Sequence, residues 1–329
     1  MYESFIFSIN AVLPIIIMVV IGYALKRVGF IDAKFAKVIN KLVFRVFLPA
    51  MLFLNVYKIE TLVSFDLRYV IFAAASGVLM FLLAIPAVIF ITPKNERRGV
   101  LLQCSFRSNY ALIGLPLAGA LFGEQGEMVA ALLSVVTIPI FNVLAVVSLT
   151  VFNKDSKRPS VASVLLGIVK NPLIQGIVAG LIVLAVRAIF VNVGITFRLS
   201  DVSPLMKVLS YLSGLATPLA LISLGAQFEL SAIGEMKKEI IFGVLTRILI
   251  VPVIALSVAY FAFRDIFTGA HFASFVALFS TPLAVSTVPM TQEMNGDATL
   301  AGQIVVWSTV ISGFTVFITA FILKSLQIF

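Results

Sequence analysis

Long apolar runs separated by short polar segments make up most of this 329-residue chain. A helix that crosses about 30 Å of hydrocarbon needs about 20 mostly apolar residues. Ten runs meet this requirement, near residues 5–25, 38–57, 68–91, 100–122, 127–152, 172–191, 206–228, 239–262, 270–292 and 299–323. The segment 161–170 (VASVLLGIVK) forms either a short interfacial helix or an extension of the sixth run. The pattern therefore predicts an all-α membrane protein with ten transmembrane helices.

A motif in the fourth run returns in modified form in the ninth. The two copies read SNYALIGLPLAGALFGE at 108–124 and STPLAVSTVPMTQEMNGD at 280–297. Each copy places a proline, Pro116 or Pro289, seven residues before a glycine that is followed by an acid. The glycines, Gly123 and Gly296, are typical of helix C-terminal ends, and the second acid, Asp297, is a suitable N-cap for the last helix.

Both prolines interrupt an apolar run of membrane-spanning length. A proline removes one backbone donor and clashes with the carbonyl four residues earlier. Hydrocarbon tolerates the freed polar groups only where they are buried in protein or line a cavity. We therefore expect the fourth and ninth helices to be broken at Pro116 and Pro289, and paired breaks of this kind indicate a transporter's substrate site. The alternative is that both prolines only kink their helices for packing.

Division of the ten helices into two sets of five, 1–152 and 153–329, predicts an inverted repeat, because an odd number of crossings makes the second set enter from the opposite side. The two broken helices can then cross and direct the N-terminal ends of their second halves at one point. Those ends carry unpaired amides and partial positive charge. They predict a site for an anion near the middle of the membrane.

Composition supports a membrane protein and charge gives an orientation. The chain is 61% hydrophobic and 12% charged, against about 45–50% and about 25% in soluble globular domains. The net charge of +9 does not indicate nucleic acid as a partner, because the charges cluster between apolar runs. One set of alternate loops holds twice as many Lys and Arg residues as the other, which predicts that both termini lie outside the cytoplasm. We expect a multi-pass protein of the plasma membrane, the inner membrane of a bacterium.

The single cysteine, Cys104, and the single histidine, His271, exclude an internal disulfide and a histidine-rich metal site. No cofactor and no metal are therefore predicted. Sodium or proton coupling stays open.

Several polar side chains near the predicted breaks have two interpretations each. Asn109 and Asn142 either bind substrate or make interhelical hydrogen bonds. Arg107 is either a counter-ion of the substrate or a side chain that snorkels to the cytoplasmic surface, and we favour the second. Arg45 and Arg247 are also expected to snorkel. Glu293 either binds a proton or cation or is solvated at the helix end, and we favour solvation.

The residues assigned to the predicted substrate site are Asn109, Tyr110, Pro116, Leu117, Asn142, Ser286, Thr287, Pro289, Met290 and Arg107. Gln292 and Glu293 are the candidates for binding a coupling ion.

The motifs NYALIGLP followed by LFG, STPLAVSTVP followed by QEMNGD, and SLGAQF at 223–228 resemble those of the auxin efflux carrier family. Because only NKDSKRPS (153–160) separates the fifth and sixth runs, the chain is most similar to the bacterial malate and malonate permeases of that family. The resemblance implies a fold like that of sodium/bile-acid symporters. Helices 1, 2, 6 and 7 would form a scaffold, and helices 3–5 and 8–10 a mobile transport domain.

The resemblance also implies that Asn109 matches the family's substrate-contacting asparagine and that the protein forms a homodimer through the scaffold. In the second copy of the motif, Pro282 occupies the position that the repeat would give to a partner of Asn109.

These observations predict a secondary transporter of a small organic anion, a mono- or dicarboxylate such as malate or an auxin-like acid, with elevator-type alternating access. Its expected partners are the carboxylate, the lipid bilayer and a second copy of the chain. The alternative is a channel or ligand-sensing receptor on the same scaffold. An intramembrane enzyme is disfavoured, since HExxH and GxSxG motifs are missing and Asn295-Gly296-Asp297 lacks the GxGD form.

Overall fold

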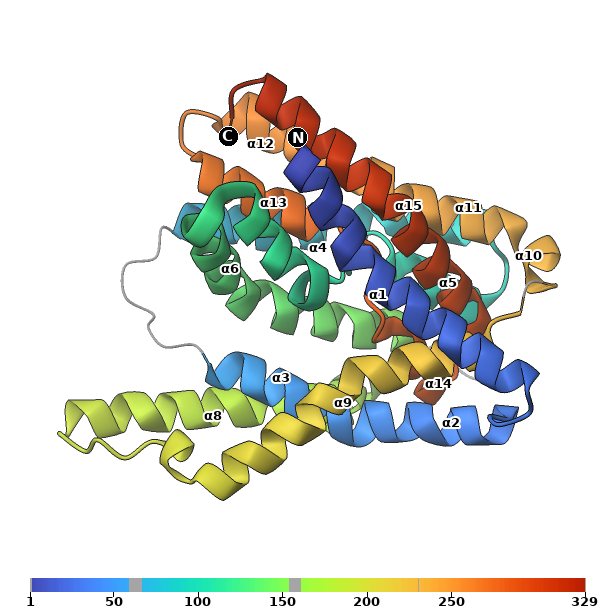
Figure 1. Ribbon diagram of the computed structural model, residues 1–329, viewed down its shortest axis with the longest axis horizontal. Helices are drawn as coiled ribbons and strands as arrows, with labels where there is room; N and C mark the ends of the chain where they lie inside the picture. The colour runs from blue at the N-terminus through green and yellow to red at the C-terminus, as the bar shows by residue number, and fades with distance from the viewer. Residues whose placement is uncertain (1, 59–66, 154–160, 230, 329) are drawn as a thin grey trace.

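The computed structural model describes residues 2–58, 67–153, 161–229 and 231–328 (Figure 1). All regular elements of these residues are helices, which confirms the all-α class. They are α1 (Tyr2–Arg27), α2 (Ala33–Leu42), η1 (Val43–Phe47), α3 (Leu48–Tyr57), α4 (Leu67–Ile91), α5 (Asn95–Gln103), η2 (Tyr110–Gly114), α6 (Leu115–Val151), α7 (Val161–Lys170), α8 (Pro172–Asn192), η3 (Leu199–Asp201), α9 (Ser203–Gln227), α10 (Ala232–Glu235), α11 (Lys237–Leu245), η4 (Thr246–Ile250), α12 (Val251–Phe263), α13 (Gly269–Phe279), α14 (Thr287–Glu293) and α15 (Ala298–Ser325).

Seven helical segments within the described residues are long and apolar enough to cross a membrane. They are Ala33–Tyr57, Leu67–Ile91, Tyr110–Val151, Pro172–Asn192, Ser203–Gln227, Lys237–Phe263 and Ala298–Ser325. The protein is therefore a multi-pass membrane protein. The segment 161–170 forms its own helix, α7, rather than extending the next one, because Asn171 caps the start of α8. The hydrophilic break at 154–160 lies outside the described residues.

Two of the three motif residues expected at helix ends, Gly123 and Asp297, have the expected role. Gly123 has a φ of 63° and, with Phe122, forms a kink inside α6 where the fourth and fifth predicted helices meet. This conformation suits glycine, which has no Cβ. Asp297 caps α15 by accepting a hydrogen bond from the Leu300 amide at 2.9 Å, as predicted. The left-handed residue before that cap is Asn295 rather than Gly296.

Two interruptions exist, but not at the predicted prolines. The first separates α5, which ends at Gln103, from η2, which begins at Tyr110. The second separates α13, which ends at Phe279, from α14, which begins at Thr287. The prediction of breaks at Pro116 and Pro289 is therefore wrong, since both prolines lie in helices that follow the interruptions.

Pro116 widens its helix instead of breaking it. The three π-helical segments η1, η2 and η4 each end two residues before a proline, at Pro49, Pro116 and Pro252. A proline ring clashes with the carbonyl four residues earlier. The wider π turn moves that carbonyl aside, so the helix continues through the proline.

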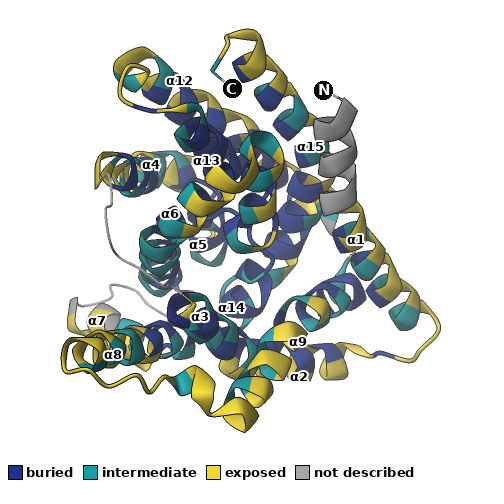
Figure 2. Cartoon of the chain, turned by 60° about the vertical axis from the view of Figure 1, so that its left-hand side comes forward, coloured by how far each residue is buried: buried dark blue, intermediate teal, exposed yellow. Residues whose placement is uncertain are grey.

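The helices pack in two groups (Figure 1). In the first group, α1 and α2 pack on α9, and α3 packs on both α8 and α9, while α1 also packs on α15 of the second group. In the second, α4, α5 and α13 pack on α6, while α11 and α14 pack on α15. Buried residues concentrate between the helices and exposed residues cover much of the outer faces (Figure 2). Those outer faces include large apolar side chains such as Phe90 and Phe261, as expected for a surface in lipid.

Close approach of α1 and α9 requires glycine. A Cβ atom at Gly225 would overlap the backbone carbonyl of Val19, and one at Gly22 would overlap the carbonyl of Ile222. Small residues allow membrane helices to approach closely and gain van der Waals contact. The α1–α9 contact therefore depends on these two positions.

We predict that Gly225→Ala destabilises the protein by about 1–3 kcal/mol, because an inserted methyl group forces the two backbones apart. The measurement is thermal unfolding of the purified protein in detergent. Gly214→Ala on the same helix is the matched control, since its added Cβ meets no atom within 4 Å. An unchanged melting temperature for Gly225→Ala would contradict the assigned packing.

Candidate functional site

The two interruptions lie directly against each other. Ser108 and Leu283 form an isolated antiparallel bridge, and the backbone amide of Asn109 donates to the carbonyl of Pro282 at 2.8 Å. A hydroxyl from α15 completes the contact, because Ser308 Oγ accepts from the Leu283 amide at 3.2 Å. Pro282 thus pairs with Asn109 through its carbonyl oxygen. The interrupted segments satisfy part of each other's backbone.

Asn109 lies in the first interruption as the N-cap of η2, not on a helix as the sequence suggested. Its side chain makes no capping hydrogen bond. The residue is only 7% exposed, and its Nδ2 has no hydrogen-bond partner among the described residues. The Ser108 hydroxyl next to it is also buried and unpaired in the same part of the chain. Such groups are costly to bury without a partner.

Arg107 is held inside the protein by uncharged groups. Its Nη1 donates to Gln103 Oε1 at 2.6 Å and approaches Met290 Sδ at 3.0 Å. Its Nη2 donates to Ser286 Oγ at 3.0 Å and to Asn142 Oδ1 at 3.2 Å. No carboxylate of the described residues forms an ion pair with it.

The residue is 3% exposed, so the favoured prediction that Arg107 snorkels to the surface is wrong. Its position within the interruption directs the side chain toward α6 and α14 instead.

A cavity of about 140 Å³ adjoins these groups. Its lining includes five residues of the predicted site, namely Arg107, Asn109, Tyr110, Asn142 and Ser286. The Tyr110 hydroxyl is already engaged, because it donates to the Ala130 carbonyl at 3.0 Å. Helices α3, α8 and α9 supply the opposite wall, with Asn55 and Thr217 as its side chains capable of hydrogen bonding.

The other residues predicted for the site do not line this cavity. They are Pro116, Leu117, Thr287, Pro289 and Met290. Of these, Met290 contacts Arg107, which does line the cavity. The sequence missed Ser108, Asn55 and Thr217. The adjacency of Ser108 to Asn109 was one available signal, and the polar Asn55 near the end of the second apolar run was another.

Gln292 and Glu293 also lie away from the cavity and contact the first helix group. Gln292 Oε1 accepts from Asn40 Nδ2 at 2.9 Å, and Glu293 Oε2 pairs with Arg45 Nε at 3.3 Å. Both contacts join α14 to the α2–η1 helix. The Arg45 side chain is 60% exposed, so this pair is the more accessible of the two.

Arg247 in η4 is fully buried, so the prediction that it snorkels is wrong. Its Nη2 donates to the carbonyl of Phe279, the last residue of α13, and its Nε and Nη1 have no partner among the described residues. The last carbonyls of a helix carry partial negative charge. The guanidinium therefore stabilises the end of the half-helix that leads into the second interruption.

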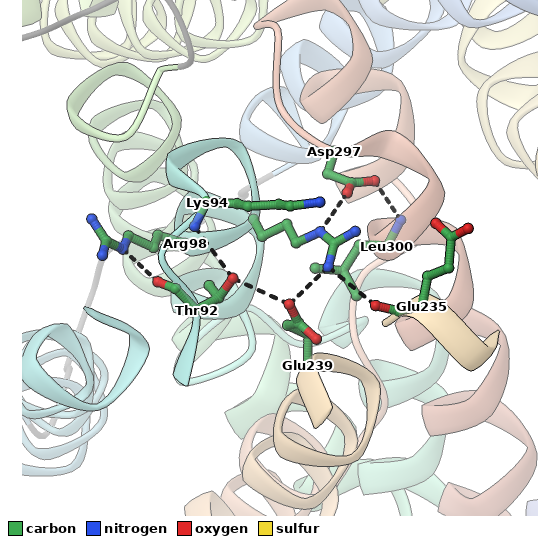
Figure 3. A network of polar contacts seen from close by, with 8 residues as sticks. Thr92, Lys94, Arg98, Glu235, Glu239, Asp297 and Leu300 are labelled. Carbon is green, nitrogen blue, oxygen red and sulfur yellow. Dashed lines mark hydrogen bonds and ion pairs between the residues drawn. The ribbon is translucent and has the colours of Figure 1, made fainter. Parts of the chain in front are cut away.

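A second polar cluster, which the sequence did not predict, connects α5, α11 and α15 (Figure 3). Arg97 Nη1 contacts Glu239 Oε1 at 2.8 Å, and Arg97 Nε contacts Asp297 Oδ2 at 3.0 Å. Thr92 Oγ1 donates to the same Glu239 oxygen at 3.1 Å. The Asp297 amide donates to the Glu96 carbonyl at 3.0 Å.

Burial alone would lower the pKa of the Arg97 guanidinium, but its hydrogen bonds to Glu239 and Asp297 raise that pKa above the usual value. Arg97 therefore stays charged and ties α5 to α11 and α15. The described residues contain no group of three or more His, Cys, Asp or Glu side chains placed to hold a metal ion.

Comparison with known proteins identifies the family of the chain. Residues 7–320 match the family model described as membrane transport protein. An uncharacterized transporter from Methanothermobacter thermautotrophicus is 24% identical over 94% of this chain and 96% of its own length. An uncharacterized transporter from Methanocaldococcus jannaschii is 29% identical over 73% of this chain and 74% of its own length.

The chain is thus a membrane transporter and not an enzyme. It belongs to the membrane transport protein family, that of the auxin efflux carriers, which confirms the predicted resemblance.

We predict that Arg97→Met destabilises the protein by about 3–5 kcal/mol, because it leaves two carboxylates without their shared cation. Thermal unfolding in detergent measures the effect. Arg264→Met is the control, since the exposed Arg264 side chain contacts its exposed neighbour Asp265 at 3.7 Å and the ring of Tyr260; it should shift stability by less than about 0.5 kcal/mol. Equal effects of the two substitutions would contradict a fastening role for Arg97.

Proposed function

We propose that the protein is a secondary transporter of a small organic anion, bound where the two interruptions meet. The observation that carries this proposal is the cavity lined by Arg107 and Asn109. Arg107 is a buried cation without a carboxylate partner among the described residues, and Asn109 offers an unpaired amide beside it. An intramembrane charge is costly unless it is neutralised. A carboxylate would neutralise the guanidinium and accept the amide hydrogen bond.

One helix end adds to the attraction for an anion. The segment η2 begins at the first interruption, at Tyr110, whereas the first two amides of α14 already donate to the carbonyls of Ala284 and Val285. The first amides of a helix have no partner within the helix and carry partial positive charge. Arg107, Asn109, Asn142 and Ser286 are the proposed substrate contacts, with Tyr110 contributing its ring to the wall.

The proposed topology is ten transmembrane helices in two inverted sets of five, residues 1–152 and 153–329. The group formed by α1, α2–η1–α3, α8 and α9 acts as the scaffold. The remaining long helices form the transport domain, which carries the crossing interruptions. The cavity lies between the two groups, which supports an elevator-type motion in which the crossing slides along the scaffold and exposes the substrate to each side in turn.

Contacts between the two groups would have to open during that motion, and two of them involve side chains of α14. The Asn40–Gln292 hydrogen bond and the Arg45–Glu293 ion pair both connect the scaffold to α14. We propose that they hold the transport domain in the observed position. Glu293 and Gln292 remain the candidates for ion coupling, because a proton or cation bound at Glu293 would compete with Arg45 and release the contact.

The proposed setting is the plasma membrane, with both termini outside the cytoplasm and two copies of the chain associated through their scaffolds. The proposed partners are a small carboxylate and lipid, and no nucleic acid.

The test is carboxylate uptake by proteoliposomes containing the intact protein, Arg107→Gln or Asn109→Ala. We expect Asn109→Ala to reduce substrate affinity by about tenfold, since it removes one hydrogen bond to a charged group. Arg107→Gln should abolish saturable uptake. Counterflow of labelled substrate should occur in the intact protein, because a carrier shows it and a channel does not.

Arg264→Gln serves as the control for removal of a positive charge, since its side chain is 60% exposed. Thermal unfolding without ligand provides a second readout. Arg107→Gln should leave the melting temperature unchanged or raise it, because it removes a desolvated charge. Normal uptake by both site variants would refute the proposal. It would also be refuted if the variants lose uptake only because their melting temperatures fall.

A further inference from the structure

The cavity between the two helix groups is small. Its volume of about 140 Å³ is close to the roughly 150 Å³ of an engineered protein cavity that accepts benzene. An occupant of about six non-hydrogen atoms therefore fills the cavity, whereas an acid that carries a fused aromatic ring system would extend beyond it.

Charge sets a second limit. Arg107 is the one charged side chain among the residues that line the cavity. A single carboxylate balances it. A second carboxylate would enter a largely apolar space without a counter-ion, where an unpaired charge is strongly disfavoured.

The scaffold wall supplies a third limit. This wall is mostly apolar, with Leu48, Leu52 and Ala220 among its residues, but it also contains Asn55 of α3 and Thr217 of α9. Both side chains are half-buried, and neither makes a hydrogen bond to a residue that the structure describes. Membrane-embedded hydroxyl and amide groups normally find a partner on their own or a neighbouring helix. These two face the cavity, across from the Arg107 group.

We propose that the substrate is a small monocarboxylate that also carries an uncharged hydrogen-bonding group, such as a hydroxyl. Arg107 and Asn109 hold its carboxylate, while Asn55 and Thr217 bind the second group and act as specificity-determining residues. This inference rests on the proposed function. The substrate is then distinguished from other carboxylates by its single negative charge, its small size and its second polar group.

A site built to hydrogen-bond a hydroxyl discriminates strongly against an analogue that lacks it, because its own polar groups are then left unpaired. An apolar residue in place of Asn55 or Thr217 leaves no unpaired polar group when the ligand lacks a hydroxyl. Loss of the polar wall should therefore change the order of preference between two acids of equal charge and similar size.

The experiment measures binding of four acids to the purified full-length protein by ligand-dependent thermal stabilisation, with affinities from calorimetry. The acids are L-lactate, propionate, malonate and indole-3-acetate. For the intact protein we expect L-lactate to bind about tenfold or more tightly than propionate. Malonate should bind weakly at neutral pH and more tightly at mildly acidic pH, where more of it is the monoanion. Indole-3-acetate should bind weakest.

The variants are Thr217→Val, which keeps the shape of the side chain, and Asn55→Leu. Both should weaken L-lactate binding by about tenfold and leave propionate binding unchanged or tighter. Ser210→Ala, at an exposed position of α9, is the control and should behave like the intact protein. If Asn55→Leu fails to fold, Thr217→Val alone tests the assignment, since it changes one half-buried hydroxyl that lines the cavity to a methyl group.

The outcomes separate this inference from the proposed function. Tight binding of malonate at neutral pH would overturn the inference, and so would equal binding of lactate and propionate. If that binding is lost in Arg107→Gln, the proposed anion transporter is still supported. Absence of stabilisation by every carboxylate would overturn both. A preference for lactate that persists in Thr217→Val and Asn55→Leu would overturn the assignment of the specificity residues.

Discussion

The site depends on one constraint, that backbone polar groups inside a membrane must find partners within the protein. Two helices are interrupted, and the hydrogen bond from the Asn109 amide to the Pro282 carbonyl allows each interruption to satisfy part of the other. Arg247 donates a hydrogen bond to the last carbonyl of α13. Two of the buried groups that stay unpaired among the described residues, the Ser108 hydroxyl and the Asn109 side-chain amide, line the cavity. The same backbone geometry thus joins the two interruptions and lines the cavity.

The repeated proline motif predicted which two helices are interrupted but not where. Pro116 and Pro289 lie after the interruptions, and Pro116 follows a π turn that accommodates its ring. Proline restricts the backbone locally, and a wider turn can absorb its clash without ending the helix. The position of a break depends on how two distant segments pair, here Ser108 with Leu283, and neither segment alone contains that information.

The arginines illustrate the same limit. Arg107 and Arg247 lie in apolar runs near helix ends, a pattern that fits snorkelling as well as burial. Both are buried, because their hydrogen-bond acceptors come from helices far away in sequence, such as Ser286 for Arg107 and Phe279 for Arg247. The Arg97–Glu239–Asp297 cluster was not predicted either, because its three residues are far apart in sequence. Asn109, Asn142 and Ser286, which line the cavity, could be proposed from the sequence, since a polar group within an apolar run needs a hydrogen-bond partner in a ligand or another helix.

The central claim is that a carboxylate binds directly to Arg107 at the crossing of the interruptions. Solid-state NMR on the protein in lipid bilayers tests it most directly, through the dipolar coupling between a ¹³C-labelled carboxylate and ¹⁵N-labelled arginine. The account predicts a coupling at hydrogen-bond distance that disappears in Arg107→Gln and persists in Arg247→Lys. Saturating ligand that binds without such a coupling, or a coupling that remains in Arg107→Gln, would contradict it.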